Sequence, residues 1–134
     1  MQQALHAFSL VVPDYDAAID FYCGTLGWEL AEDIPQDSQS GPKRWVRILP
    51  PGSAPLRASL ILAQARGPRQ TAAIGDQFGG RVGLFLQTDD FARDHKAMCA
   101  KGVHFEEDPR HEPYGTVAVW QDPFGNRWDL LELR

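Results

Sequence analysis

The chain repeats one pattern of structural signals at about half its length. Asp14 and Asp90 each precede a stretch with helical apolar spacing, and they are 76 residues apart. Gly27 and Gly102, which end those stretches, are 75 residues apart, so the second helix is expected to be one residue shorter. A repeat of this size predicts two copies of one supersecondary unit. Because one helix cannot cover a sheet by itself, we expect the copies to pack together.

Each copy has the order of elements strand, helix and three strands. In the first copy, residues 1–65, Asp14 follows a run ending in β-branched residues and can cap a helix. This pattern predicts a strand at 5–12, a helix from Asp14 to Gly27, a short strand at 28–32, and strands at 44–49 and 56–63 around a turn at 50–55.

A Gly-rich segment at 66–80 reads as a linker with room for one helical turn, and the same order then repeats in residues 81–134. The second copy predicts a strand at 81–87, a helix at 91–101 ended by Gly102, and strands at 103–107, 115–121 and 127–133, the last two around the turn at 122–126.

Length, composition and charge limit the domains, binding partners and cellular location that we expect of this chain. In a stretch of 134 residues we expect no separate regulatory domain. The net charge of -5 comes from interspersed residues without a Lys/Arg run, so nucleic acid is not an expected partner. No run approaches the roughly 20 apolar residues of a membrane span, and the start lacks signal-peptide features, so a cytoplasmic protein is expected. Cys23 and Cys99 lie far apart without metal-site spacing and are expected to be buried, reduced thiols.

Several motifs together resemble the vicinal-oxygen-chelate superfamily, which includes glyoxalase, bleomycin-resistance proteins and extradiol dioxygenases. They are VVPDYDAAIDFYCGTLGWEL, TDDF, KGVHFEEDPRHEPYGTVAV and DPFGNRWDLLE, which cover nearly the whole chain. The resemblance implies an α+β fold in which two βαβββ modules form a cupped mixed sheet with the helices outside. It also implies a homodimer, as is common for such two-module chains.

Members of this superfamily that use a metal hold it with His and Glu side chains on the first and last strands of the modules. By this pattern, the first ligand position is Ala7, one residue after His6, and its counterpart in the second module is Gly83. The position on the last strand is Asp129. A shift of one residue turns a strand side chain to the opposite face, so His6 is expected to be structural or at the surface unless the strand bulges.

The remaining ligand position lies within residues 61–64, where only Gln64 could bind a metal. A catalytic ion generally needs about three protein ligands. We therefore expect no cofactor and treat Asp129, Gln64 and His6 as weak metal candidates. A site for Fe, Mn, Ni or Zn is the alternative.

Strand alternation assigns side chains to faces. On the first strand Phe8, Leu10 and Val12 should face the helix, and Trp120 and Trp128 should do so on the last hairpin. Small residues at former ligand positions should open space for a ligand in an apolar cavity. The candidate ligand-binding residues are Ser9, Trp45, Arg47, Phe85, Gln87, Tyr114, Arg127 and Asp129.

Two functions remain open at this point. The first is a metal-independent protein that binds a small aromatic or cationic molecule, with Trp45, Phe85 and Tyr114 stacking on it and Asp129 meeting positive charge. The second is a lyase, isomerase or dioxygenase acting on a small metabolite with a divalent metal. Arg127 and Asp129 could instead form a structural ion pair with each other or with Arg47. A role of the scaffold in assembly is a third possible function.

Overall fold

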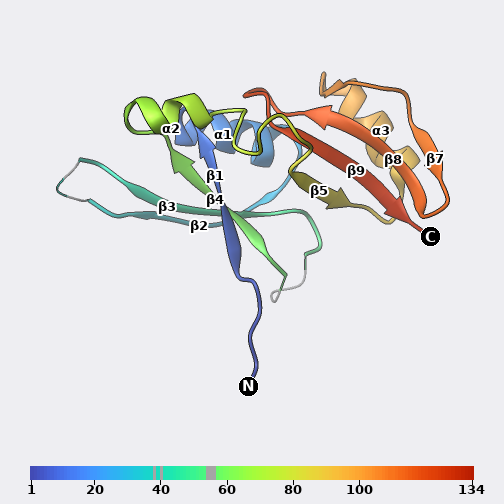
Figure 1. Ribbon diagram of the computed structural model, residues 1–134. Helices are drawn as coiled ribbons and strands as arrows, with labels where there is room; N and C mark the ends of the chain where they lie inside the picture. The colour runs from blue at the N-terminus through green and yellow to red at the C-terminus, as the bar shows by residue number, and fades with distance from the viewer. Residues whose placement is uncertain (38, 40, 54–56) are drawn as a thin grey trace. The chain divides into compact units, whose positions relative to one another are not determined.

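A computed structural model describes residues 1–37, 39, 41–53 and 57–134. The chain divides into two compact units, Met1–Thr71 (unit 1) and Ala72–Arg134 (unit 2), each with a sheet of its own (Figure 1). Residues 38 and 40, between the strands predicted at 28–32 and 44–49, lie outside the described residues. So do residues 54–56, where the predicted turn meets the next strand.

Unit 1 contains a four-stranded mixed sheet in the order β1-β4-β3-β2, with β1 parallel to β4 and the other pairs antiparallel (Figure 1). Its elements are β1 (Ala7–Val12), α1 (Tyr15–Ile19), η1 (Asp20–Thr25), β2 (Glu29–Pro35), β3 (Arg44–Leu49) and β4 (Ser59–Gln64). The division between the units falls within the following helix, α2 (Gly67–Ala73).

Unit 2 repeats the arrangement in the order β5-β9-β8-β6, with β7 also paired to β8. Its elements are β5 (Leu84–Gln87), α3 (Phe91–Ala100), β6 (His104–Phe105), β7 (Arg110–Glu112), β8 (Gly115–Gln121) and β9 (Arg127–Leu133). The predicted α+β class and the repeated strand order are confirmed. The predicted strand at 103–107 is shorter than expected, and β7 was missed because its three residues carry no alternating pattern.

The two helical stretches differ by one residue because the first helix changes its winding. After α1 the chain forms the π-helical turn η1, in which Leu26 N–H donates to the carbonyl oxygen of Phe21, five residues back. A π turn accommodates one more residue than an α turn. The unequal spacing in the sequence therefore reflects one extra residue in the first helix, which the π turn accommodates.

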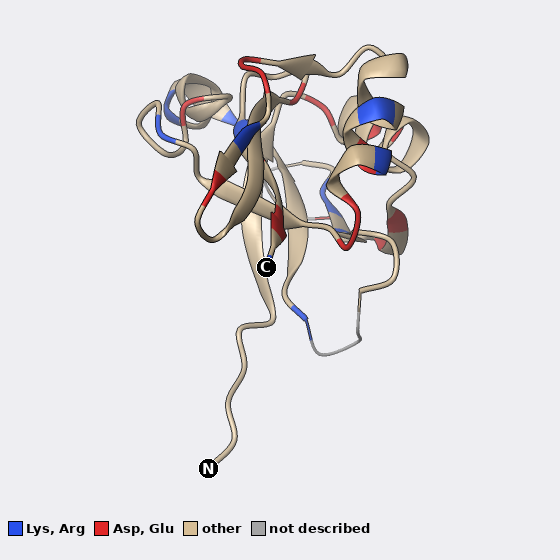
Figure 2. Ribbon diagram, turned by 90° about the vertical axis from the view of Figure 1, so that its right-hand side faces the viewer, with Lys and Arg blue, Asp and Glu red and all other residues tan. Residues whose placement is uncertain are grey.

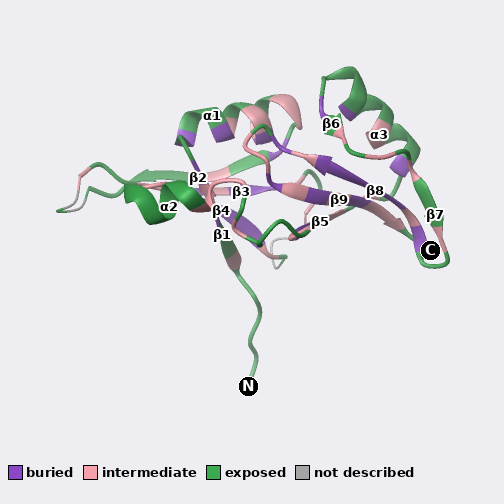
Figure 3. Ribbon diagram, turned by 45° about the horizontal axis from the view of Figure 1, so that its top comes forward, coloured by how far each residue is buried: buried purple, intermediate pink, exposed green. Residues whose placement is uncertain are grey.

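The core of each unit lies between its sheet and its helix, and the longest runs of buried residues are in β4 and β8 (Figure 3). Trp120 and Trp128 are buried there with their rings stacked 5.1 Å apart, on the helix side of the sheet as alternation predicts. Leu10 and Val12 are also buried. Phe8 shares their face but stays 48% exposed, because alternation sets where a side chain points and not whether a helix covers it.

Both cysteines are free, but the prediction that they are buried was wrong. Cys99 is exposed and Cys23 is half-buried, and partial burial raises the pKa of the Cys23 thiol. Acidic and basic positions are spread over several elements of the ribbon rather than gathered along one (Figure 2). Within the described ranges, no helix is both long enough and apolar enough to cross a membrane.

Candidate functional site

The turn between β8 and β9 sets the register of the sheet face in unit 2. Asp122 is buried, and its Oδ1 accepts hydrogen bonds from the backbone N–H groups of Phe124 (3.0 Å) and Asn126 (2.9 Å). Its Oδ2 accepts from the Asn126 side chain at 2.7 Å. Such an Asx turn fixes the start of β9. It therefore fixes which β9 side chains face away from the helix, Asp129 among them.

Asp129 lies in the middle of this face, paired in register with Phe85 on β5 and Val119 on β8. Its Oδ1 atom is buried and has no hydrogen-bond partner among the residues that the structure describes. Burial is the main cause that raises the pKa of Asp129, and Glu107 adds to it, while Arg110 and Arg127 act in the opposite direction. A buried carboxylate oxygen without a donor is costly. Because Asp129 as a whole is only partly buried, its carboxylate can turn toward a donor that a ligand supplies.

The neighbouring cations are committed to other carboxylates. Arg127 donates from Nη2 and Nε to the two Glu106 oxygens at 2.8 Å each, and from Nη1 to the Gly80 carbonyl oxygen. Arg110 donates to Glu107 and Glu112, at 3.0 Å in each case. The Arg127–Asp129 ion pair considered from the sequence is thus replaced by Arg127–Glu106. Spacing along β9 could not reveal this pairing, because Glu106 lies on a different segment of the chain.

The other candidates of unit 2 are accessible. The Phe85 side chain is 64% exposed beside Asp129, and Gln87 follows on the same face of β5. Tyr114 is 51% exposed in the turn between β7 and β8. Unit 2 therefore offers the exposed ring of Phe85 next to the carboxylate of Asp129.

In unit 1 the corresponding face carries Trp45 and Arg47, opposite the buried Val46 and Ile48. Arg47 Nε donates to Glu32 Oε1 at 2.5 Å, and Trp45 Nε1 donates to the same oxygen at 3.4 Å. The hydrogen bond from Arg47 is the main cause that lowers the pKa of Glu32. This pairing holds the indole of Trp45 on the strand surface rather than in the core.

Trp45 borders a pocket of about 390 Å³ within unit 1. Ser9 and Gln64 also line it, which brings three of the residues singled out in the sequence together, whereas Arg47 does not line it. Sequence reasoning missed the other polar lining residues: Tyr15, Lys43, Arg44, Arg66 and Gln70. The sequence offered a signal for Tyr15 alone. Tyr15 and Phe91 each directly follow a capping Asp, and this equivalence could have placed Tyr15 near a strand end.

The hydrogen bonds at the two helix starts identify the remaining ligand position of the family pattern, which the sequence placed only within residues 61–64. Gln64 Oε1 accepts the Tyr15 N–H at 3.1 Å, and Glu132 Oε1 accepts the Phe91 N–H at 2.8 Å, so Gln64 and Glu132 are equivalent residues at helix starts. Three residues before each lie Ile61 and Asp129. Gln64 therefore supports a helix N-terminus, and Ile61 occupies the position where a ligand would be.

The described residues do not fit a family-type metal site. Ala7, Ile61 and Gly83 offer no donor atom from their side chains, and a Cβ added at Gly83 would lie 2.1 Å from the Phe78 ring. Phe78 fills the space that loss of a ligand side chain was expected to open. His6 is exposed and precedes β1. Over the part of the chain that the structure describes, no three His, Cys, Asp or Glu side chains group as metal ligands.

Comparisons with known proteins agree with this fold. An uncharacterized protein of Shewanella frigidimarina is 51% identical over 133 residues, which are 99% of this chain and 96% of that one. The crystal structure of TnmS3, described as an antibiotic binding protein from Streptomyces sp. CB03234, is similar with a TM-score of 0.75 and 30% identity over 99% of this chain and 98% of that one.

UcmS2 is similar with a TM-score of 0.80 and 28% identity over 98% of each chain. The model of the Glyoxalase/Bleomycin resistance protein/Dioxygenase superfamily matches residues 4–130. This match spans nearly the whole chain, both modules included. The chain belongs to the glyoxalase/bleomycin resistance protein/dioxygenase superfamily.

Proposed function

We propose that this protein binds a small aromatic or cationic molecule on its apolar sheet faces, and that it does so without a catalytic metal. The observation that carries the proposal is the buried, unpartnered Oδ1 atom of Asp129 beside the exposed ring of Phe85, within the described part of the chain. A cationic aromatic compound satisfies both features, because its ring stacks on Phe85 while its charged N–H group donates to Asp129. The similarity to TnmS3, described as an antibiotic binding protein, supports binding rather than turnover.

The enzyme alternative receives less support. A metal-assisted reaction needs an ion held by about three protein ligands, and the family positions supply one carboxylate. No catalytic step is therefore assigned to a metal. Elemental analysis of the protein purified without a histidine tag tests this point directly, since stoichiometric Fe, Mn, Ni or Zn would contradict the proposal.

Binding itself is tested with proflavine, a cationic acridine, by calorimetric titration of the full chain. Wild type should bind it saturably, and Asp129→Asn should weaken binding about tenfold, the loss expected for one charge-assisted hydrogen bond. Phe85→Ala should also weaken it. Asp108→Asn removes the same charge from an exposed loop and serves as the matched control. Equal affinity of Asp129→Asn and Asp108→Asn would contradict the assignment of Asp129.

We also propose that the protein is a cytoplasmic homodimer. Two free thiols suit a reducing compartment. Exposed large side chains on the strands, including Phe8, Ile34 and Leu133, are apolar surface that a second copy could cover. Sedimentation equilibrium should give twice the chain mass, and a monomer at all concentrations would contradict the dimer.

A further inference from the structure

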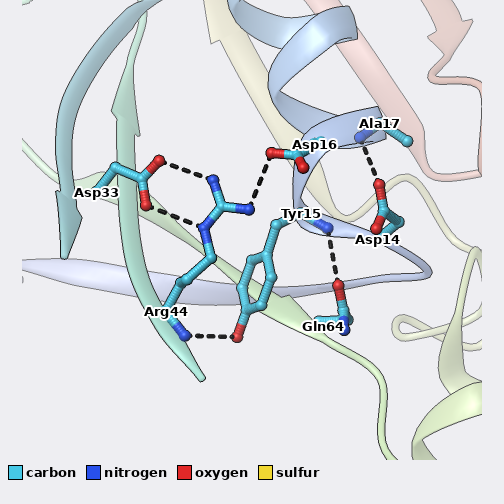
Figure 4. Close-up of polar contacts among 7 residues, drawn as sticks. All are labelled: Asp14, Tyr15, Asp16, Ala17, Asp33, Arg44 and Gln64. Carbon is cyan, nitrogen blue, oxygen red and sulfur yellow. Dashed lines mark hydrogen bonds and ion pairs between the residues drawn. The ribbon is translucent and has the colours of Figure 1, made fainter. Parts of the chain in front are cut away.

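The pocket of unit 1 is lined by side-chain oxygens that accept hydrogen bonds from the main chain. Gln64 Oε1 accepts the backbone N–H of Tyr15 at 3.1 Å, and the Tyr15 hydroxyl oxygen accepts the backbone N–H of Arg44 at 3.3 Å (Figure 4). At the pocket edge, Gln70 Oε1 accepts the backbone N–H of Arg66 at 2.9 Å. Three side-chain oxygens that line one pocket thus each accept a hydrogen bond from the main chain.

These contacts leave donors for a ligand. A backbone N–H can bond only to the oxygen of an amide side chain, so the NH₂ groups of Gln64 and Gln70 are fixed at the other end. The Tyr15 hydroxyl, with its oxygen accepting, still has its proton to donate. The pocket therefore presents donors to whatever enters it.

The charged residues that line the pocket also favour a ligand group that accepts hydrogen bonds. No Asp or Glu is among the lining residues, whereas Lys43 is exposed there and forms no ion pair with any residue the structure describes. The Arg44 guanidinium is balanced by Asp33 at 2.7 Å and Asp16 at 2.9 Å (Figure 4). Lys43 thus adds positive charge that the pocket itself does not neutralise.

We propose that this pocket binds the anionic group of an aromatic molecule, a carboxylate or an equivalent oxyanion. Gln64, Tyr15 and Lys43 donate to the anion, and the half-buried indole of Trp45 contacts the ring. The proposal rests on the proposed binding function and specifies which chemical group of a ligand unit 1 binds. Unit 1 selects a ligand group that accepts hydrogen bonds, whereas Asp129 in unit 2 selects one that donates them.

Unit 2 supplies the matched pair of variants for a test. Glu132 makes with Phe91 N–H the hydrogen bond that Gln64 makes with Tyr15 N–H, so the fold accepts Glu as well as Gln at such a position. Gln64→Glu therefore keeps the acceptor for Tyr15 while it replaces the donor in the pocket with negative charge. Glu132→Gln makes the reverse exchange away from the pocket. Both variants should unfold within about 2 °C of wild type, because each keeps its helix contact.

The probes are three compounds with one ring system and different charge: the naphthoate anion, neutral naphthamide and the naphthylmethylammonium cation. Calorimetric titration should show wild type and Glu132→Gln binding naphthoate about tenfold more tightly than naphthamide, with the preference reduced by salt. Gln64→Glu should lose the preference, and Lys43→Gln should reduce it.

Equal affinity of naphthoate and naphthamide in wild type would overturn the inference, as would an unchanged preference in both Gln64→Glu and Lys43→Gln. Either result, with the naphthalene ring still bound, leaves the proposed binding function standing. Tightest binding of the cation, lost in Asp129→Asn, would also overturn the inference and support the site in unit 2 alone. Failure of all three compounds and of proflavine to bind would contradict the proposed function as well.

Discussion

Asp129 and Trp45 are the two residues on which the proposed binding depends most. Asp129 has a buried oxygen without a donor among the described residues, although Arg110 and Arg127 both lie near enough to influence its pKa. Those arginines bind Glu107 and Glu106 instead. Trp45 is held on the strand surface by Glu32. In unit 2, Glu107 and Glu106 thus bind the arginines that could otherwise have neutralised Asp129.

Asp129→Asn should stabilise the protein while it weakens binding. The pKa of Asp129 is raised in the folded state, mainly by burial, so ionising this group costs folding free energy at pH values above its folded pKa. We expect the variant to raise the midpoint of thermal unfolding by about 2 °C at pH 7. The gain should vanish as the pH falls below the ordinary Asp pKa of about 3.9.

Differential scanning calorimetry of Asp129→Asn and of the control Asp108→Asn over this pH range checks the prediction. Asp108 is exposed, so its substitution should change the midpoint little. A midpoint lowered by Asp129→Asn at pH 7 would show that the carboxylate is satisfied in the folded protein.

Trp45 should account for the quenchable tryptophan fluorescence. Trp28, Trp120 and Trp128 are 5% exposed or less, whereas Trp45 is half-buried at the pocket. Acrylamide should therefore quench one component of the emission, and Trp45→Phe should remove that component with little change in stability. Quenching that persists unchanged in Trp45→Phe would mean that another tryptophan is accessible.

At the scale of elements, hairpin and helix geometry place these residues. The Asx turn at Asp122 fixes the start of β9, and the π turn η1 accommodates one additional residue in the first helix. The start of β8 is similarly constrained. Gly115 has a φ of 149°, and a Cβ there would lie 1.9 Å from the carbonyl oxygen of Glu132 on β9. Only glycine allows this approach of the two strands.

Gly115→Ala should therefore destabilise the chain by about 1–3 kcal/mol, from strain and from displacement of β9. Gly24→Ala is the control, because a Cβ there meets nothing within 4 Å and the backbone needs no positive φ. Urea unfolding of both variants gives the comparison. Equal free energies of unfolding would show that the β8–β9 contact relaxes without cost.

The sequence predicted elements better than contacts. Period and spacing identified the repeated strand order, the helix caps at Asp14 and Asp90, and the burial of Trp120 and Trp128, because these depend on local pattern. The strand β7 and the Phe78 ring at Gly83 could not be foreseen, since they depend on residues brought together by the fold. The donor-lined pocket was missed for the same reason, as its polarity depends on which oxygen each backbone N–H reaches.

At the scale of the whole molecule, one repeated module carries two different surfaces. Unit 1 places Ile61 where unit 2 places Asp129, and Gln64 where unit 2 places Glu132. Both units keep the hydrogen bond from the start of the helix to the last strand of the module, while the charge of the side chains on the sheet face differs between them. Membership of the superfamily accounts for the architecture, whereas these differences determine what each unit can bind.

Proflavine titration before and after dialysis against EDTA tests the central claim, binding without a metal, most directly. We predict saturable binding with the same Kd in both samples and no change on adding Ni²⁺ or Zn²⁺. Binding that is lost after chelation and restored by either ion would contradict the account, and so would the absence of saturable binding in both samples.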